Sequence, residues 1–170
     1  VARGTLGAMG LAEAADGFEQ PGRIALVTER PETAVRWRRD LSLHLWERLM
    51  LLSRDQALAL AGADTGGPEV FQPDVFLIDS DLGAAGTGQR LMSDLRCRGD
   101  SRHAAICIVQ ADEDAARAAM AFDLGADDLV GPTVDPAELA LRLRALLRRK
   151  RHADRLRASV ENSMRLAMID

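Results

Sequence analysis

Five short runs of apolar residues recur along the chain, separated by longer stretches in which apolar positions follow helical spacing. The runs are IALV (24–27), LMLLS (49–53), VFLI (75–78), AICIV (105–109) and the weaker DLV (128–130). A short run that is apolar at consecutive positions is typical of a strand covered on both faces of a parallel sheet. The pattern therefore predicts five strands.

Helices are expected in the intervals between these runs and after the last of them. They are predicted over Pro31 to about Leu45, Asp55–Ala61, Gly88–Arg98, 112–125 and Pro136–Met168. Alternating strands and helices predict an α/β fold with a five-stranded parallel sheet, doubly wound by helices on both faces. In such sheets functional groups gather at the carboxyl ends of the strands.

Two helix boundaries carry clear local signals. Gly125 is placed to cap the carboxyl end of the fourth helix, because glycine accepts the left-handed conformation that ends many helices. Asp135 and Pro136 are placed to start the fifth helix, since Asp supplies a capping oxygen and Pro suits the first turn.

The last helix is too long to be covered by a domain of this size. Leu139, Leu143 and Leu146 have the spacing of a face that docks on the sheet. Beyond Lys150 the apolar positions continue as an imperfect heptad seam, formed by Ala153, Leu156, Val160, Met164 and Ala167. We interpret residues 150–170 as a stalk that pairs with a second copy; the alternative is a tail without a partner.

Composition and charge narrow the class of protein. The 170 residues carry a net charge of -4, which gives no general reason to expect nucleic-acid binding. Cys97 and Cys107 do not suggest a disulfide framework, so a reducing compartment and a cytoplasmic location are expected. The three histidines lack metal-ligand spacing, and no apolar run is long enough to cross a membrane.

One basic stretch leaves nucleic-acid binding as an alternative. Its eight cations are Arg142, Arg144, Arg148, Arg149, Lys150, Arg151, Arg155 and Arg157. They are distributed around the predicted helix and have no aromatic residues between them, so we interpret them as a solvated surface and expect no nucleic-acid partner.

Three sequence segments resemble a response-regulator receiver domain. They are PDVFLID (73–79), with Asp79 at the phosphoacceptor position, GADD (125–128) before the fifth strand, and VDPAELALRLRALLRR (134–149). The resemblance covers residues 23–149 and implies the flavodoxin-like, CheY-like receiver fold, here with an extended C-terminal helix.

The flanks are similar to those of the second, adaptor receiver of PleD-like response regulators. Residues 1–22 look like a linker from a preceding receiver domain, and 148–170 resemble the helix that leads into a GGDEF diguanylate cyclase domain. No GGDEF signature occurs in this chain, so we expect a non-catalytic adaptor cut before that domain. The resemblance implies a homodimer through the fourth helix, fifth strand, fifth helix and stalk.

The receiver site is degenerate at its metal-binding positions. Receivers have an Asp pair after the first strand, where this chain has Thr28 and Glu29. With Glu29 and Asp79 as the remaining carboxylates, only weak Mg²⁺ binding is expected. Asp81 is expected to be a solvated loop carboxylate.

The remaining receiver positions are also replaced. Gln110 stands where receivers carry a hydroxyl, Pro132 and Thr133 fall where they carry Lys-Pro, and Leu129 replaces the aromatic switch. The interpretation is a vestigial Asp79, no cofactor and no catalytic residue. The alternative is an active receiver in which a histidine kinase phosphorylates Asp79 with the help of Mg²⁺.

Overall fold

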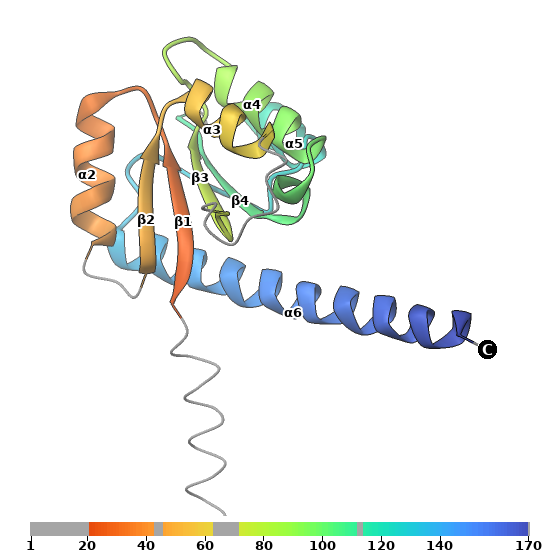
Figure 1. The fold of residues 1–170 in the computed structure, drawn as a ribbon. Coiled ribbons are helices and arrows are strands. Elements are labelled where there is room, and N and C mark those ends of the chain that lie inside the picture. The colour runs from red at the N-terminus through yellow and green to blue at the C-terminus, as the bar shows by residue number, and fades with distance from the viewer. Residues whose placement is uncertain (1–20, 43–45, 63–71, 112–113, 170) are drawn as a thin grey trace, which may run out of the picture.

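Five parallel strands form a single sheet in the order β2-β1-β3-β4-β5 (Figure 1). The computed structural model describes residues 21–42, 46–62, 72–111 and 114–169. The strands are β1 (Gly22–Val27), β2 (Trp46–Leu52), β3 (Val75–Asp79), β4 (Ala105–Val109) and β5 (Asp128–Val130). All five predicted strands are therefore present, and β2 begins three residues earlier than the apolar run.

Helices cover both faces of the sheet, as predicted. They are α2 (Pro31–Leu41), α3 (Arg54–Gly62), α4 (Thr87–Arg96), α5 (Ala115–Asp123) and α6 (Pro136–Met168), with a 3-10 turn η1 (Asp100–His103). One core cluster joins the sheet to α3, α4 and α5, and the other joins it to α2 and α6. The first helix ends at Leu41 rather than near Leu45, and residues 43–45 lie outside the described residues.

The caps that the sequence predicted are confirmed. Gly125 has φ +117°, and Ala126 N–H donates to Ala121 O at 3.0 Å while Gly125 N–H donates to Phe122 O at 3.1 Å. This pair of bonds is the Schellman motif. At the start of α6, Asp135 Oδ1 accepts from Ala137 N–H at 2.8 Å.

The long helix α6 has a buried part and a projecting part. Its buried residues are Leu139, Ala140, Leu143, Leu146 and Leu147, which include the three leucines predicted to dock. Residues 158–169 are all exposed, and Figure 1 shows this end of α6 extending past the sheet. Within the described part of the chain, no helix is both long enough and apolar enough to span a membrane.

Candidate functional site

Asp79 ends the central strand β3, and its side chain is 1% exposed. It is paired in register with Val109 of β4, while β1 lies on the other side of β3. Because the strands are parallel, the loops that follow β1 and β4 meet Asp79 at the same edge of the sheet.

The guanidinium group of Arg30 forms hydrogen bonds with both oxygens of this carboxylate. Arg30 Nη2 donates to Asp79 Oδ1 at 2.7 Å, and Arg30 Nε donates to Asp79 Oδ2 at 2.8 Å. Thr28 Oγ1 donates to Oδ2 at 2.9 Å, and Asp81 N–H donates to Oδ1 at 3.2 Å. Each carboxylate oxygen therefore accepts two hydrogen bonds, two of the four from a bidentate charged partner.

The backbone after β1 positions Arg30 for this contact. Arg30 precedes Pro31, which disfavours helical geometry at the preceding residue, and it has extended dihedrals of φ -92° and ψ 114° as the N-cap of α2. Its N–H donates to Thr28 Oγ1 at 3.2 Å, so Thr28 contacts both partners of the ion pair. The hydrogen bond to Asp79 raises the pKa of Arg30 above its ordinary value.

Asp81, expected to be a solvated loop carboxylate, lies on the β3–α4 loop and makes only long contacts through its side chain. Its side chain is half-buried, Oδ1 accepts from Gly86 N–H at 3.4 Å and lies 3.9 Å from Arg117 Nη2. Together with the hydrogen bond from its backbone to Asp79, these contacts make Asp81 an organising residue of the β3–α4 loop.

The start of α4 lies very close to the end of β3. Gly88 N–H donates to Ser80 O at 2.9 Å, and Ser80 N–H donates to Val109 O at 2.9 Å. A Cβ atom at position 88 would stand 2.0 Å from Asp79 O, so only glycine permits this approach. The contact fixes α4 directly against the backbone of the candidate phosphoacceptor.

The other predicted positions do not join Asp79 in a phosphoryl site. Glu29 is exposed, and its Oε1 accepts from Arg54 N–H at 3.4 Å. Gln110 is 2% exposed; its Oε1 accepts from Gln89 Nε2 at 2.8 Å, while its own Nε2 has no partner.

The loop after β5 supplies no cation at this position. Pro132 is half-buried and Thr133 is exposed, in a turn where Val134 N–H donates to Gly131 O at 3.2 Å. The positive charge against Asp79 comes instead from the loop after β1.

These donors do not fit a magnesium ion. Mg²⁺ takes oxygen ligands in octahedral geometry, usually one or two carboxylates with several waters, and both oxygens of Asp79 are engaged by Arg30 and Thr28. Among the residues with described positions, no group of three or more His, Cys, Asp or Glu side chains could hold a metal ion. Arg30 donates to both Asp79 oxygens, which a bound Mg²⁺ would need as free ligands.

Sequence reasoning missed Arg30, although a signal was present. Thr28 and Glu29 indicate a lost carboxylate, and by themselves they do not indicate which cation balances Asp79. A buried carboxylate without a lysine after β5 needs a partner, and Arg30 is the next residue after the degenerate pair.

Comparisons with known proteins agree with this fold. No protein-family model matches the chain. Over 149 residues it is 28% identical to the response regulator PleD of Caulobacter vibrioides, a match that covers 88% of this chain and 31% of PleD. The chain thus spans about a third of the length of this curated relative.

Two solved receiver structures are similar in fold. One is a CheY-like response regulator receiver domain protein of Methanospirillum hungatei, with a TM-score of 0.64, 16% identity, and coverage of 79% of this chain and 99% of that one. The other is the receiver domain of a Pseudomonas aeruginosa sensor histidine kinase, described with a magnesium ion coordinated in its active-site cleft. It has a TM-score of 0.62, 20% identity, and coverage of 75% and 98%. The chain therefore has the CheY-like receiver fold and is related to the response regulator PleD.

Proposed function

We propose that this receiver domain is a non-catalytic adaptor in two-component signalling that is not phosphorylated on Asp79. Its role is to hold two protomers together and to relay their arrangement to an output domain, as the second receiver of a PleD-like diguanylate cyclase would. The observation that carries the proposal is the bidentate contact of Arg30 with the buried Asp79 carboxylate.

The chemistry of aspartyl phosphorylation supports the proposal that Asp79 is not phosphorylated. The acceptor carboxylate must present an oxygen lone pair to the incoming phosphorus, and cations must stabilise the charge of the phosphoryl oxygens. Here the guanidinium occupies both carboxylate oxygens, and Thr28 adds a further hydrogen bond. The charge of the carboxylate is thus balanced by Arg30, and both of its oxygens are hydrogen-bonded, without phosphate or metal.

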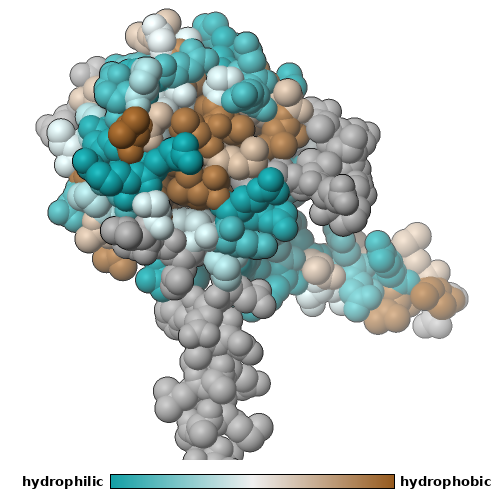
Figure 2. Space-filling view, turned by 60° about the vertical axis from the view of Figure 1, so that its left-hand side comes forward, coloured by the Kyte–Doolittle hydropathy of each residue, from teal (hydrophilic) through white to brown (hydrophobic). Residues whose placement is uncertain are grey.

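The projecting part of α6 supports the relay and dimer part of the proposal. Leu156, Val160 and Met164 recur every four residues and are 55%, 57% and 63% exposed. Figure 2 shows hydrophobic side chains among hydrophilic ones along this part, especially toward its end. Ala153 is half-buried beside the body, so a seam between two copies would begin at Leu156.

The proposed dimer face continues onto the body through α5, β5 and the start of α6. Met120 and Phe122 on α5 and Leu141 on α6 are 54%, 49% and 64% exposed. A symmetric pairing of this face would place two α6 helices side by side, since an isologous interface uses the same patch on both copies. A GGDEF output domain on each helix would then be brought to face its counterpart.

The phosphorylation part is tested by incubating the full chain with acetyl phosphate and Mg²⁺ and measuring the intact mass. We expect no gain of a phosphoryl group in the wild type, and the same mass behaviour in the Asp79→Asn variant. A phosphoryl gain in the wild type that is missing in Asp79→Asn would instead establish the alternative, an active phosphoacceptor.

A further inference from the structure

Between its buried part and its exposed end, the helix α6 has a middle segment, residues 148–157. The last buried residue of the helix is Leu147, and residues 158–169 are all exposed. The half-buried residues of the middle segment are Lys150, Arg151, Ala153, Asp154 and Arg157. All but one of them carry a charge at neutral pH, so this segment faces the body mainly with charged groups rather than with apolar side chains.

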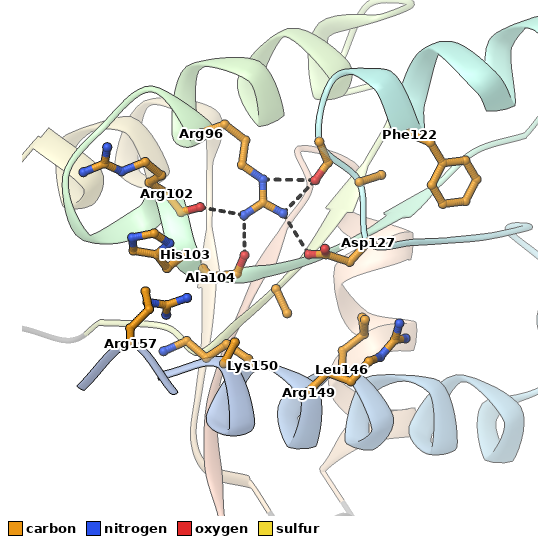
Figure 3. A pocket seen from close by; sticks show the side chains of 14 residues that line it. Arg96, Arg102, His103, Ala104, Phe122, Asp127, Leu146, Arg149, Lys150 and Arg157 are labelled. Atoms are coloured by element: carbon orange, nitrogen blue, oxygen red, sulfur yellow. Dashed lines mark hydrogen bonds and ion pairs between the residues drawn. The ribbon is translucent and has the colours of Figure 1, made fainter. Parts of the chain in front are cut away.

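A hollow of about 510 Å³ separates this segment from the body, and positive charge lines both of its sides. The α6 side carries Arg149, Lys150 and Arg157, and the body side carries Arg96, Arg102 and His103. Arg96 is balanced by Asp127 at 2.8 Å. Figure 3 shows Lys150 and Arg157 pointing from α6 toward the body, with His103 facing Arg157.

The titration of His103 reflects this concentration of like charge. Its pKa is lowered first by burial and then by the charges of Arg157 and Arg102, with Asp154 opposing and Lys150 adding to the effect. A cation is therefore disfavoured at this place. The same repulsion acts between the two sides of the hollow and opposes the close approach of α6 to the body.

The carboxylate of Asp74 supplies an attraction across this gap. Lys150 Nζ lies 3.5 Å from Asp74 Oδ1, and the two side chains are only 17% and 26% exposed. On α6 itself, Lys150 Nζ donates to Asp154 Oδ2 at 2.6 Å, and Asp154 also pairs with Arg157. The ammonium group therefore lies between one carboxylate of the body and one of the helix.

The residue type at position 150 suits this arrangement. Lys150 is the only lysine in a chain that has 22 lysine and arginine residues. An ammonium is a compact charge with three donors on a flexible stem, whereas a guanidinium is a planar fork that fits a single carboxylate best. Lysine is thus the cation better able to serve two carboxylates on different elements.

Asp74 is itself held firmly by the sheet. Its Oδ2 accepts from Arg23 N–H at 3.0 Å, its N–H donates to Arg23 O at 2.9 Å, and its carbonyl accepts from Ala105 N–H at 2.9 Å. These bonds join Asp74 to the starts of β1 and β4, and Asp74 directly precedes β3. The strand that ends at Asp79 therefore contacts α6 from its other end.

We propose that Asp74, Lys150 and Asp154 form a latch that keeps the projecting part of α6 ordered, and that release of this latch lets the helix unfold beyond Lys150. Isolated helices of this length are marginal in water, because most helical stability comes from the packing of one face. Beyond Leu147 that packing is replaced by an ion pair, which like charge opposes. The latch acts within one protomer, so the proposal does not require the proposed dimer.

Amide hydrogen exchange of the full chain tests the latch, at a dilution where sedimentation shows a monomer. Asp74→Asn removes the charge but keeps an oxygen for Arg23 N–H, and Lys150→Met removes the charge but keeps an unbranched side chain. Each variant should speed exchange in residues 158–168 about threefold, the effect of losing one ion pair. Exchange in residues 139–147 should not change. The double variant should exchange no faster than Lys150→Met, because the contact is already lost.

Two controls separate the latch from general effects on the helix. Arg155→Ala, an exposed arginine of the same segment, should leave exchange in residues 158–168 unchanged. Raising sodium chloride from about 0.05 to about 0.5 M should speed exchange there in the wild type, and have little effect in the double variant. The proposal is overturned if Asp74→Asn does not speed exchange in residues 158–168, if Arg155→Ala speeds it equally, or if residues 139–147 are affected to the same extent.

Discussion

Arg30 and Asp79 form a charged pair in which one partner is 1% exposed and the other is 42% exposed. The carboxylate depends on that partner, because a buried charge without compensation is strongly unfavourable. The guanidinium reaches solvent, which reduces its net contribution below that of a fully buried pair.

Replacing Arg30 with Ala should therefore lower the free energy of unfolding by about 2 kcal/mol, because Asp79 is left buried with only Thr28 and Asp81 N–H as donors. Urea denaturation followed by the fluorescence of the buried Trp37 measures this loss.

The matched control repeats the substitution in the Asp79→Asn background. There the loss on replacing Arg30 should be much smaller, because the amide carries no charge to leave unpaired. Equal losses in the two backgrounds would show that Arg30 does not act through the Asp79 charge.

A second property at the residue scale concerns Cys107, which lies on β4 inside the core. Burial raises the pKa of its thiol from 9.0 to about 12. An unfolded chain releases this proton near pH 9 and the folded chain near pH 12, so the stability contributed by the neutral thiol is complete below pH 9 and is lost between the two values.

Alkaline denaturation should reveal this linkage clearly, since the sequence has no tyrosine and a single lysine, Lys150. The free energy of unfolding should fall by up to about 1.4 kcal/mol per pH unit above pH 9. In Cys107→Ala the starting stability should be lower, but the fall with pH should be shallower. Parallel curves for the two proteins would contradict the assignment to Cys107.

At the scale of elements, the junction of β3 and α4 is the tightest backbone contact at the site. A Cβ on Gly88 would lie 2.0 Å from Asp79 O and 2.6 Å from Ser80 Cα, both of them backbone atoms that cannot rotate away. Any larger residue must push α4 off the end of β3.

Gly88→Ala should thus lower the free energy of unfolding by at least about 2 kcal/mol, since overpacking against backbone forces the elements apart. Thermal denaturation monitored by circular dichroism provides the measurement. Gly131→Ala is the matched control, because a Cβ there meets nothing within 4 Å; it should be close to neutral. Similar losses in both variants would show that the loss at Gly88 does not come from the close contact.

The elements could be predicted from the sequence where burial alone decides them. β3 and β4 are buried at every position, so their apolar runs match the strands residue for residue or nearly so. β2 begins at Trp46, earlier than its apolar run, because it is an edge strand in which Glu47 and Arg48 are exposed. A search for continuous apolar runs does not include exposed charged strand residues such as Glu47 and Arg48.

The site was less predictable because it depends on one side chain that crosses between loops. The place of Asp79 follows from the strand pattern, and the loss of the receiver acids and lysine follows from the residues themselves. The contact with Arg30 spans 49 positions. It is fixed by the direction of an N-cap side chain, which neither periodicity nor composition specifies.

At the scale of the whole molecule, α6 divides into a part that stabilises the body and a part that does not. Leu139, Leu143 and Leu146 are buried, while residues 158–169 are exposed throughout. Removing the exposed part takes away no core contact.

A chain ended after Arg157 should therefore keep its free energy of unfolding to within about 0.5 kcal/mol. Its self-association, measured by sedimentation equilibrium, should be weaker than that of the full chain, because Val160 and Met164 of the seam are lost. Val160→Asp in the full chain should weaken association in the same way, and Arg155→Ala is an exposed control on the same helix. Unchanged association in both the truncated chain and Val160→Asp would assign any dimer to the body alone.

The continuity of α6 also has a mechanical consequence. From Lys150 to Met168 the helix extends about 28 Å at 1.5 Å per residue, with no break between the part held in the core and its far end. In the proposed adaptor it would therefore act as a lever arm. A tilt of the body by about 10° would displace the far end by about 5 Å, so a rearrangement too small to disturb the core is amplified into a change that a neighbouring domain can register.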